Sequence, residues 1–285
     1  LNEVGGETNI ATGYHAIEFL LWGQDQSETG PGERAYTDYV VSSNGPNGCY
    51  SGPPTHACAC GGAETECVAA GGPFPMWTDQ CNCPTNAERR GQYLTVVGDM
   101  LVGHLSQLQT AWAPSATYRV GFEADPVNSF GKILTGMIIL SGFETGSERL
   151  KAALVSKDQE DEHSCFSDNT HRDMIQDIQG IQNVYVGSYT RVDGSAVSGT
   201  SVKDVVADTD SALADRLATE ITSALDLANA LQIPFESEIA PGNTEGNTRV
   251  QSLITALRTV EGTLEEVFTA MGFSVSQKLY GKRTV

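Results

Sequence analysis

The sequence has few positively charged residues and no long apolar run, and both absences exclude classes of protein. Lysine and arginine together number 17 against 36 aspartates and glutamates, which gives a formal net charge of −19 at pH 7. A surface of this charge repels a phosphate backbone, so nucleic-acid binding is not expected. The chain contains no run of about 18 apolar residues, so a membrane-spanning helix is not expected either.

Sustained alternation of apolar and polar residues, the pattern of a half-buried strand, is also missing. Apolar side chains instead recur at spacings of three and four, which is typical of helices with one face in a core. We predict helices over residues 10–23, 86–112, 127–157, 167–187, 202–231 and 247–272. The predicted fold is therefore all-α, with long antiparallel helices packed in bundles.

The segments between these helices are rich in glycine, proline or serine. Residues 26–84 and 192–200 are predicted to be loop or linker, and residues 233–243 a turn. The apolar stripe from Tyr93 to Trp112 is expected to face a core, with His104 as a buried histidine inside it.

Cysteine is absent from most of the chain and concentrated in one segment. Six of the seven cysteines are Cys49, Cys58, Cys60, Cys67, Cys81 and Cys83. Such a cluster favours disulfides and an oxidising, extracytoplasmic compartment. A zinc site is the alternative, although the close pairs are spaced C-x-C rather than like zinc knuckles. The seventh, Cys165, is expected to be a buried thiol outside this cluster.

Histidine is scarce, with five in the chain, and one of them lies in an apolar segment. The segment ATGYHAIEFLLWGQD, residues 11–25, places His15 and Glu18 three residues apart and therefore on one face of a helix, beside Tyr14. A buried carboxylate without a partner costs on the order of several kcal/mol. Glu18 should therefore find a cation, a metal ion or a hydrogen-bond network, and both a structural tie and a metal site fit this spacing.

A second segment repeats the spacing in reverse. Residues 158–173, DQEDEHSCFSDNTHRD, contain Glu160 and His163, which would lie near Ser167 and His171 if the segment were helical. Carboxylate and imidazole groups from different helices build metal sites in bundles. A run of acidic residues is equally typical of a solvated surface.

The candidate residues follow from these two segments. His15, Glu18, Glu160 and His163 are the candidate metal ligands, with His171 and Tyr14 as further candidates. Asp168 and Asn169 are expected to cap the helix that follows them.

Several segments together resemble the imelysin family, whose G-x-H-x-x-E motif corresponds to Gly13, His15 and Glu18. The resemblance also covers GPGERAYTDY (30–39), FGKILTGMIILSGFE (130–144), DQEDEHSCFSDNTH (158–171) and GIQNVYVGSYTRVDGSAVSGTS (180–201). It implies two helical bundles with the motif near their junction, which we place at residues 1–125 and 126–285. It also implies an extracytoplasmic location, in the periplasm or tethered to an outer membrane, and a link to iron acquisition.

Two departures from the family pattern stand out. Only twelve residues precede Gly13, where family members usually carry a further helical region, so the first bundle is expected to be incomplete in this chain. A retained N-terminal fragment or a second chain would complete it. The cysteine-rich segment at about 45–84 is interpreted as an insertion.

Three functions follow from these observations. The preferred one is non-enzymatic metal binding in an iron-uptake system, with iron favoured over zinc as the bound ion. The second is a zinc metallopeptidase in which Glu160 or Glu162 is the general base, although H-E-x-x-H is absent. The third is a metal-free binding module that uses the cysteine-rich loop as its contact surface.

Overall fold

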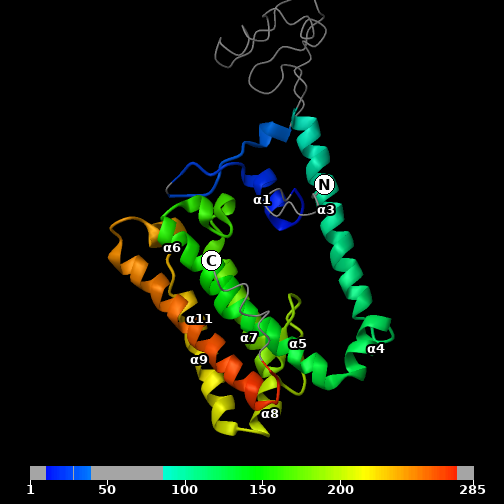
Figure 1. The fold of residues 1–285 in the computed structure, drawn as a ribbon. Helices are drawn as coiled ribbons and strands as arrows, with labels where there is room; N and C mark the ends of the chain where they lie inside the picture. The colour runs from blue at the N-terminus through cyan, green and yellow to red at the C-terminus, as the bar shows by residue number, and fades with distance from the viewer. Residues whose placement is uncertain (1–10, 28, 40–85, 275–285) are drawn as a thin grey trace, which may run out of the picture. The chain divides into compact units, whose positions relative to one another are not determined.

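The structure of the protein is a computed structural model. It describes residues 11–27, 29–39 and 86–274 (Figure 1). The six clustered cysteines, and with them the predicted disulfides and insertion, lie outside the described residues. In the described part of the chain no helix is both long and apolar enough to cross a membrane.

The structure confirms the all-α prediction. The longer helices are α1 (Tyr14–Trp22), α3 (Asn86–Ala111), α4 (Thr117–Ala124), α5 (Pro126–Ile138), the π-helix η4 (Ile139–Lys151), α7 (Thr170–Val186), α9 (Ser211–Asn229) and α11 (Thr244–Ala270). The shorter ones are η1 (Tyr36–Tyr39), α6 (Ala152–Ser156), η5 (Gln159–Asp161), η6 (Cys165–Ser167), α8 (Val202–Ala207) and α10 (Phe235–Ile239). One small hairpin pairs β1 (Ser188–Thr190) with β2 (Ala196–Ser198) in antiparallel register.

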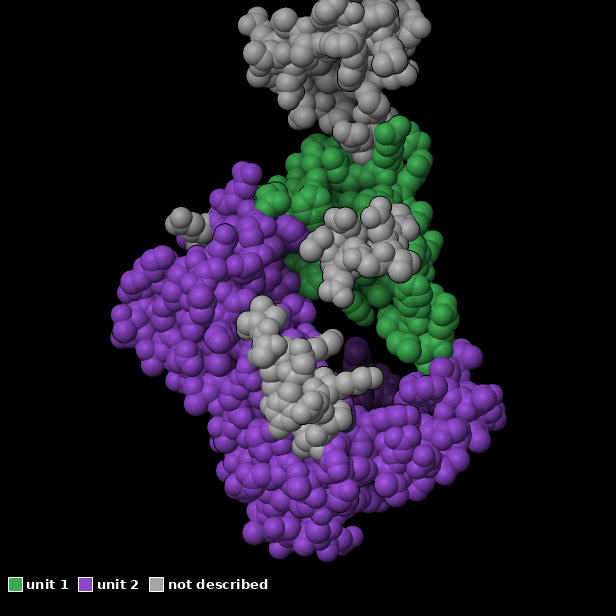
Figure 2. Space-filling model, viewed as in Figure 1, with its two compact units in different colours: residues 1–24, 32–109 green, residues 25–31, 110–285 purple. Residues whose placement is uncertain are grey.

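Contacts divide the chain into two compact units, coloured separately in Figure 2. Unit 1 comprises residues 1–24 and 32–109, and unit 2 comprises residues 25–31 and 110–285. The predicted boundary between residues 125 and 126, and the predicted incompleteness of the first bundle, stay predictions.

Unit 2 is a helical bundle built around α11. This helix packs against η4, α9, α5 and α10, while α7 packs against α9, η4 and α8 (Figure 1). The stripe predicted on α11 is buried, including Leu253, Leu257 and Leu264, which are each 0% exposed. On α9 the buried positions recur every three to four residues, through Leu213, Leu217 and Ile221, as the sequence pattern predicts.

Side-chain caps fix where these helices begin. The Asp125 carboxylate accepts a hydrogen bond from the amide of Asn128, with Pro126 in the first turn of α5. Asp210 and Asn243 cap α9 and α11 in the same way, through the amides of Leu213 and Gly246. These caps satisfy backbone donors that a helix leaves unpaired at its N-terminus.

The predicted helix over residues 127–157 is continuous but changes its geometry in the middle. Between α5 and α6 the chain forms the π-helix η4, a wider winding that is rare at this length. Gly142 and Gly146 of η4 face α11, and a methyl group added at Gly142 would lie 2.2 Å from Oε2 of Glu261. Glycine at this position therefore allows the two helices to approach closely.

Four expectations about local structure are wrong. The expected turn at 233–243 contains the short helix α10, and the expected linker at 192–200 contributes β2 to the hairpin. The stripe expected to face a core is largely exposed on α3, where Leu105 is 46% and Leu108 59% exposed, because few described residues pack against it. His104 on the same helix is exposed rather than buried.

Candidate functional site

The His15–Glu18 pair forms on α1 as its spacing predicts. Nδ1 of His15 lies 2.8 Å from Oε2 of Glu18. Glu18 is buried, at 8% exposure, whereas the His15 side chain is 49% exposed. An imidazole that solvent can reach is thus hydrogen-bonded to a carboxylate that is largely shielded from it. Tyr14 is 65% exposed on the same helix.

Glycines and the segment after α1 fix the position of this helix within unit 1. Gly13 precedes the helix with φ +92°, a conformation that side-chain-bearing residues rarely adopt. A methyl group added at Gly32 would lie 2.7 Å from the carbonyl oxygen of Trp22. Tyr39 donates a hydrogen bond to the carbonyl of Leu20. The GPGERAYTDY segment therefore holds the end of α1.

Helix α3 contributes two further contacts to this part of unit 1. The hydroxyl of Tyr93 donates to the carbonyl of Ala11, just before α1. Nη1 of Arg90 donates to the carbonyl of Asp38 at 2.6 Å. Both contacts come from the first half of α3, so this half anchors the residues on either side of the His15–Glu18 pair.

The second predicted segment lies in unit 2 and is not a helix. Residues 159–167 form the 3-10 turns η5 and η6, which a bend and a turn at residues 162–164 separate, so the helical face expected to unite Glu160, His163, Ser167 and His171 does not form. The expected capping is wrong in detail as well: Asn169 occupies the N-cap position of α7 but makes no side-chain cap hydrogen bond, and Asp168 lies outside that position. Cys165 is buried in this segment, as expected.

His163 contacts a carboxylate of α7. Its Nδ1 lies 2.8 Å from Oδ2 of Asp173, and the Ser164 hydroxyl donates to the same oxygen at 2.5 Å. Glu160 is exposed, and its backbone amide donates to Asp158.

His171, in the first turn of α7, is partly buried. Burial lowers the pKa of its imidazole below the usual value, so the ring is neutral at pH 7. Its Nδ1 is buried and has no hydrogen-bond partner among the described residues. A neutral imidazole is the form that binds metal ions, so His171 remains a further candidate ligand.

The structure also brings together four buried acidic side chains of unit 2 that the sequence did not single out as a group. Asp25 is 3% exposed, and Glu162, Asp168 and Glu236 are each 8% exposed. They come from the 25–31 segment, from the residues after η5 and η6, and from α10. Nothing in the sequence pattern links these four positions, and acidic residues in loops usually indicate solvated surface.

Burial raises the pKa of three of these four carboxyls. It raises the pKa of Glu162 to about 8, and the charges of Glu236, Asp168 and Asp25 raise it further. For Asp168 the value is about 6, first because of burial and then because of the charge and hydrogen bond of Asp25. For Glu236 it is about 7, for which burial is the main cause. Near neutral pH this cluster therefore retains protons.

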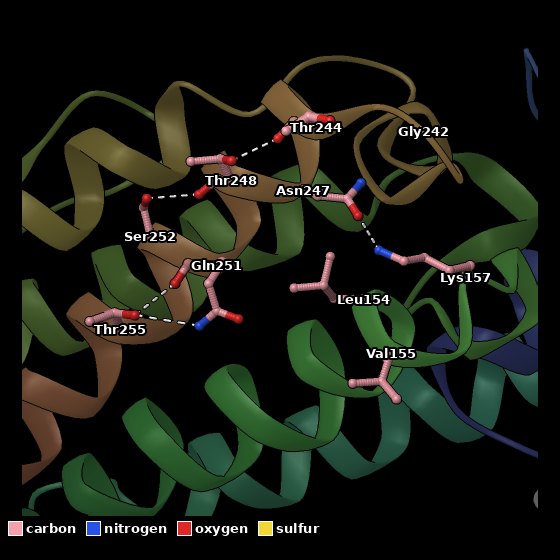
Figure 3. Close-up of a pocket in the computed structure, with 10 residues that line it drawn as sticks. All are labelled: Leu154, Val155, Lys157, Gly242, Thr244, Asn247, Thr248, Gln251, Ser252 and Thr255. Carbon is pink, nitrogen blue, oxygen red and sulfur yellow. Dashed lines mark hydrogen bonds between the residues drawn. The ribbon is translucent and has the colours of Figure 1, made fainter.

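A groove of about 740 Å³ lies elsewhere in unit 2, between α6 and the first half of α11 (Figure 3). Its α11 side presents the side chains of Thr244, Asn247, Thr248, Gln251, Ser252 and Thr255. The hydroxyls of Thr248, Ser252 and Thr255 donate to backbone carbonyls one turn earlier in α11. Lys157 donates to Asn247 across the groove (Figure 3). The polar groups of the groove are thus largely used within the bundle.

No three His, Cys, Asp or Glu side chains among the described residues are already grouped as ligands of a metal ion. The assignment of His15, Glu18, Glu160 and His163 as metal ligands therefore stays a prediction. The structure gives a carboxylate partner for two of the three candidate histidines, Glu18 for His15 and Asp173 for His163.

Comparison with known proteins assigns the chain to a family. A search of curated proteins found no match. The sequence model of the imelysin family matches residues 2–264, which includes α1 and its His15–Glu18 pair as well as the whole bundle of unit 2 except the end of α11. The family is linked to iron-regulated proteins and to peptidases. Because the match covers most of the chain, the protein is a member of the imelysin family.

Proposed function

We propose that this protein binds a metal ion, with iron as its physiological ion, through His15 and Glu18 on α1. The observation that carries the proposal is the 2.8 Å contact between Nδ1 of a half-exposed His15 and Oε2 of a buried Glu18. The two atoms are within hydrogen-bond distance, and a metal ion that binds both groups would displace the proton of that hydrogen bond. Metal affinity should therefore rise with pH.

The chemistry of the donors fits a transition-metal ion such as iron or zinc, and the preference for iron comes from the link of the family to iron-regulated proteins. Iron and zinc both accept mixed imidazole and carboxylate ligands, whereas oxygen-only ligands favour calcium or magnesium. Burial of Glu18 keeps the carboxylate away from competing water, and exposure of His15 leaves a path by which an ion can arrive. The net charge of −19 raises the local concentration of cations.

The cellular role follows from family membership and remains part of the proposal. We place the protein outside the cytoplasm, in the periplasm or tethered to an outer membrane, as part of an iron-uptake system. Its proposed partners are other components of that system. Glu160 and His163 remain predicted ligands, as do the further candidates His171 and Tyr14.

Metal analysis of purified protein tests the proposal. Protein loaded with iron under anaerobic conditions, or with zinc, should retain about one ion per chain after desalting, with iron retained more strongly. The double variant His15→Ala/Glu18→Ala should lose this ion. The matched control is His104→Ala, which removes an exposed histidine of α3 and should keep it. Equal metal content in the double variant and the wild type would contradict the assignment.

A zinc peptidase is the second candidate, supported by the link of the family to peptidases. The structure argues against one of its two proposed bases, because burial raises the pKa of Glu162 to about 8 and leaves this carboxyl mostly protonated at pH 7. Glu160, the other proposed base, is exposed. Chelator-sensitive cleavage of a protein substrate that is lost in Glu160→Gln would establish the peptidase. A metal-free binding module would show neither metal retention nor cleavage.

A further inference from the structure

Helix α1, which carries His15 and Glu18, depends on other segments of unit 1 for its stability. It has nine residues, fewer than the roughly 12–15 that an isolated helix needs to be even marginally stable in water. Its N-cap residue, Gly13, makes no side-chain hydrogen bond to the first turn. Contacts from outside must therefore hold this helix, and the position of both candidate ligands depends on those contacts.

The segment that follows α1 supplies partners for the last carbonyl groups of the helix. An α-helix leaves the carbonyls of its last four residues without partners of its own. The Leu20 carbonyl accepts a hydrogen bond from the Tyr39 hydroxyl. The Trp22 carbonyl accepts one from the backbone amide of Arg34 at 2.8 Å. Leu20 and Glu18 are the two buried residues of α1, so Tyr39 binds the helix just after the candidate ligand.

Tyr39 is held in turn by Arg90 of α3. The guanidinium carbon of Arg90 lies 5.9 Å from the centre of the Tyr39 ring, which is a cation–π contact. Nη1 of Arg90 also donates to the Asp38 carbonyl at 2.6 Å. The Asp38 carboxylate lies 3.9 Å from Arg90 and 3.3 Å from Arg34. Arg90 therefore contacts two successive residues of η1, one of which binds α1.

The Tyr39 hydroxyl remains a hydrogen-bond donor near neutral pH. Burial raises the pKa of this phenol above its ordinary value of 10.0, and the opposing effects of Arg34 and Arg90 are smaller. The phenol is therefore protonated over the whole pH range in which metal binding would be measured. Its hydrogen bond to Leu20 does not titrate in that range.

We propose that Tyr39 and Arg90 are positioning residues of the His15–Glu18 site, with Tyr39 holding the turn of α1 after Glu18 and Arg90 acting through Tyr39. This inference rests on the proposed function, because it concerns the metal affinity of the same site. A metal ion binds only those molecules in which α1 presents both ligands, so the apparent dissociation constant rises as that fraction falls. Loss of either contact should therefore lower the affinity and leave the stoichiometry unchanged.

Equilibrium titration of the full chain with iron(II) under anaerobic conditions tests the role of Tyr39. Tyr39→Phe removes the hydroxyl alone and keeps the ring beside Arg90. Its affinity should be about fivefold lower than that of the wild type, the effect of one typical hydrogen bond. Tyr36→Phe is the matched control, because Tyr36 lies in the same 3-10 helix, is 80% exposed and should keep the wild-type affinity.

The pH dependence of the affinity separates positioning from the loss of a ligand. Tyr39→Phe keeps both ligands and their protonation, so its affinity should be lower than that of the wild type by the same factor at each pH. A purely structural role would lower the urea midpoint of the variant and leave its iron affinity unchanged. Equal affinities of Tyr39→Phe and the wild type would therefore overturn the role of Tyr39.

A double-mutant cycle tests whether Arg90 acts through Tyr39. Arg90→Ala should also lower the iron affinity, and Arg90→Ala/Tyr39→Phe should lose less than the product of the two single effects. A double variant that loses the full product would overturn the role of Arg90. Failure of the wild type to bind iron would overturn the proposed function and this inference with it, whereas unchanged binding in Tyr39→Phe overturns this inference alone.

Discussion

Arg34 contacts Phe19 through one hydrogen bond and one cation–π interaction. Nη2 of Arg34 donates to the Phe19 carbonyl at 3.2 Å, and its guanidinium carbon lies 5.4 Å from the centre of the Phe19 ring. Because Phe19 follows Glu18 directly, this contact fixes the turn of α1 that carries the candidate metal ligand. Arg34 also pairs with Asp38 at 3.3 Å, so it joins α1 to the segment that follows it.

Replacement of Arg34 by alanine should therefore weaken metal binding without removing a ligand. We expect the iron affinity to fall by about tenfold, because ordering α1 would cost about 1.4 kcal/mol more when the ion binds. Arg34→Lys should restore only part of the affinity, since lysine keeps the charge but loses the planar group over the ring. Equilibrium titration with iron measures the effect, with Arg119→Ala, an exposed arginine of α4, as the control. Equal affinities of Arg34→Ala and wild type would contradict the role given to Arg34.

The Glu238–Arg249 pair should contribute strongly to the stability of unit 2. Arg249→Ala leaves the fully buried Glu238 carboxylate without its cation, which typically costs about 3–5 kcal/mol. Urea unfolding measures this loss directly. The comparison is Arg216→Ala, whose partner Glu266 is exposed, and for which we expect a loss below about 1 kcal/mol. Similar losses in the two variants would show that burial does not set the strength of these pairs.

Stability should fall as the pH rises through neutrality, opposite to the usual effect of carboxylates. The pKa of Glu162 is about 8 in the fold against 4.5 for the ordinary group, so the folded state holds this proton more tightly than the unfolded state does. Its contribution is fully present below pH 4.5 and is lost as the pH rises to about 8. Glu236, with a pKa of about 7, and Asp168, with about 6, act in the same direction.

The free energy of unfolding at a series of pH values tests this expectation. Between pH 5 and 8 we expect the wild type to lose on the order of a few kcal/mol, since one pKa unit corresponds to about 1.4 kcal/mol. The Glu162→Gln variant has no titratable group at this position, so its free energy of unfolding should decline less steeply with pH. Exposed Asp161→Asn should follow the wild type. A wild-type stability that rises over this range would mean that the cluster does not keep its protons.

The helices could be predicted from the sequence. The contacts between polar side chains of different segments could not. The spacing of Leu213, Leu217 and Ile221 predicts the buried face of α9, because a core selects for apolar residues at every turn. His15 and Glu18 could be paired because three residues separate them on one helix. Asp25 and Glu236 lie far apart in the chain, and only the folded bundle brings them together.

The exposed stripe of α3 shows the limit of periodicity itself. A helical pattern predicts which side chains share a face, and those of Leu101, Leu105 and Leu108 do recur as expected. It does not determine what covers that face, and among the described residues little packs against it. The helix considered for the segment after Lys157 was wrong for a different reason. Its acidic residues and histidines have helical spacing, but the local turns at Asp158 and Asp168 prevent a continuous helix, and Asp168 has φ +53°.

Gly142 should be a position of the bundle that does not tolerate a larger residue. Gly142→Ala would place a methyl group 2.2 Å from Oε2 of Glu261, a buried residue of α11 that also pairs with Arg258. Relief of this clash requires η4 and α11 to move apart or the ion pair to break, and we expect a loss of about 2–4 kcal/mol in urea unfolding. Gly136→Ala, at a helical glycine of α5 with no atom within 4 Å of the added methyl, should instead gain about 0.5–1 kcal/mol because alanine favours helices. If both substitutions were stabilising, the close approach of η4 to α11 at Gly142 would not be a requirement of the fold.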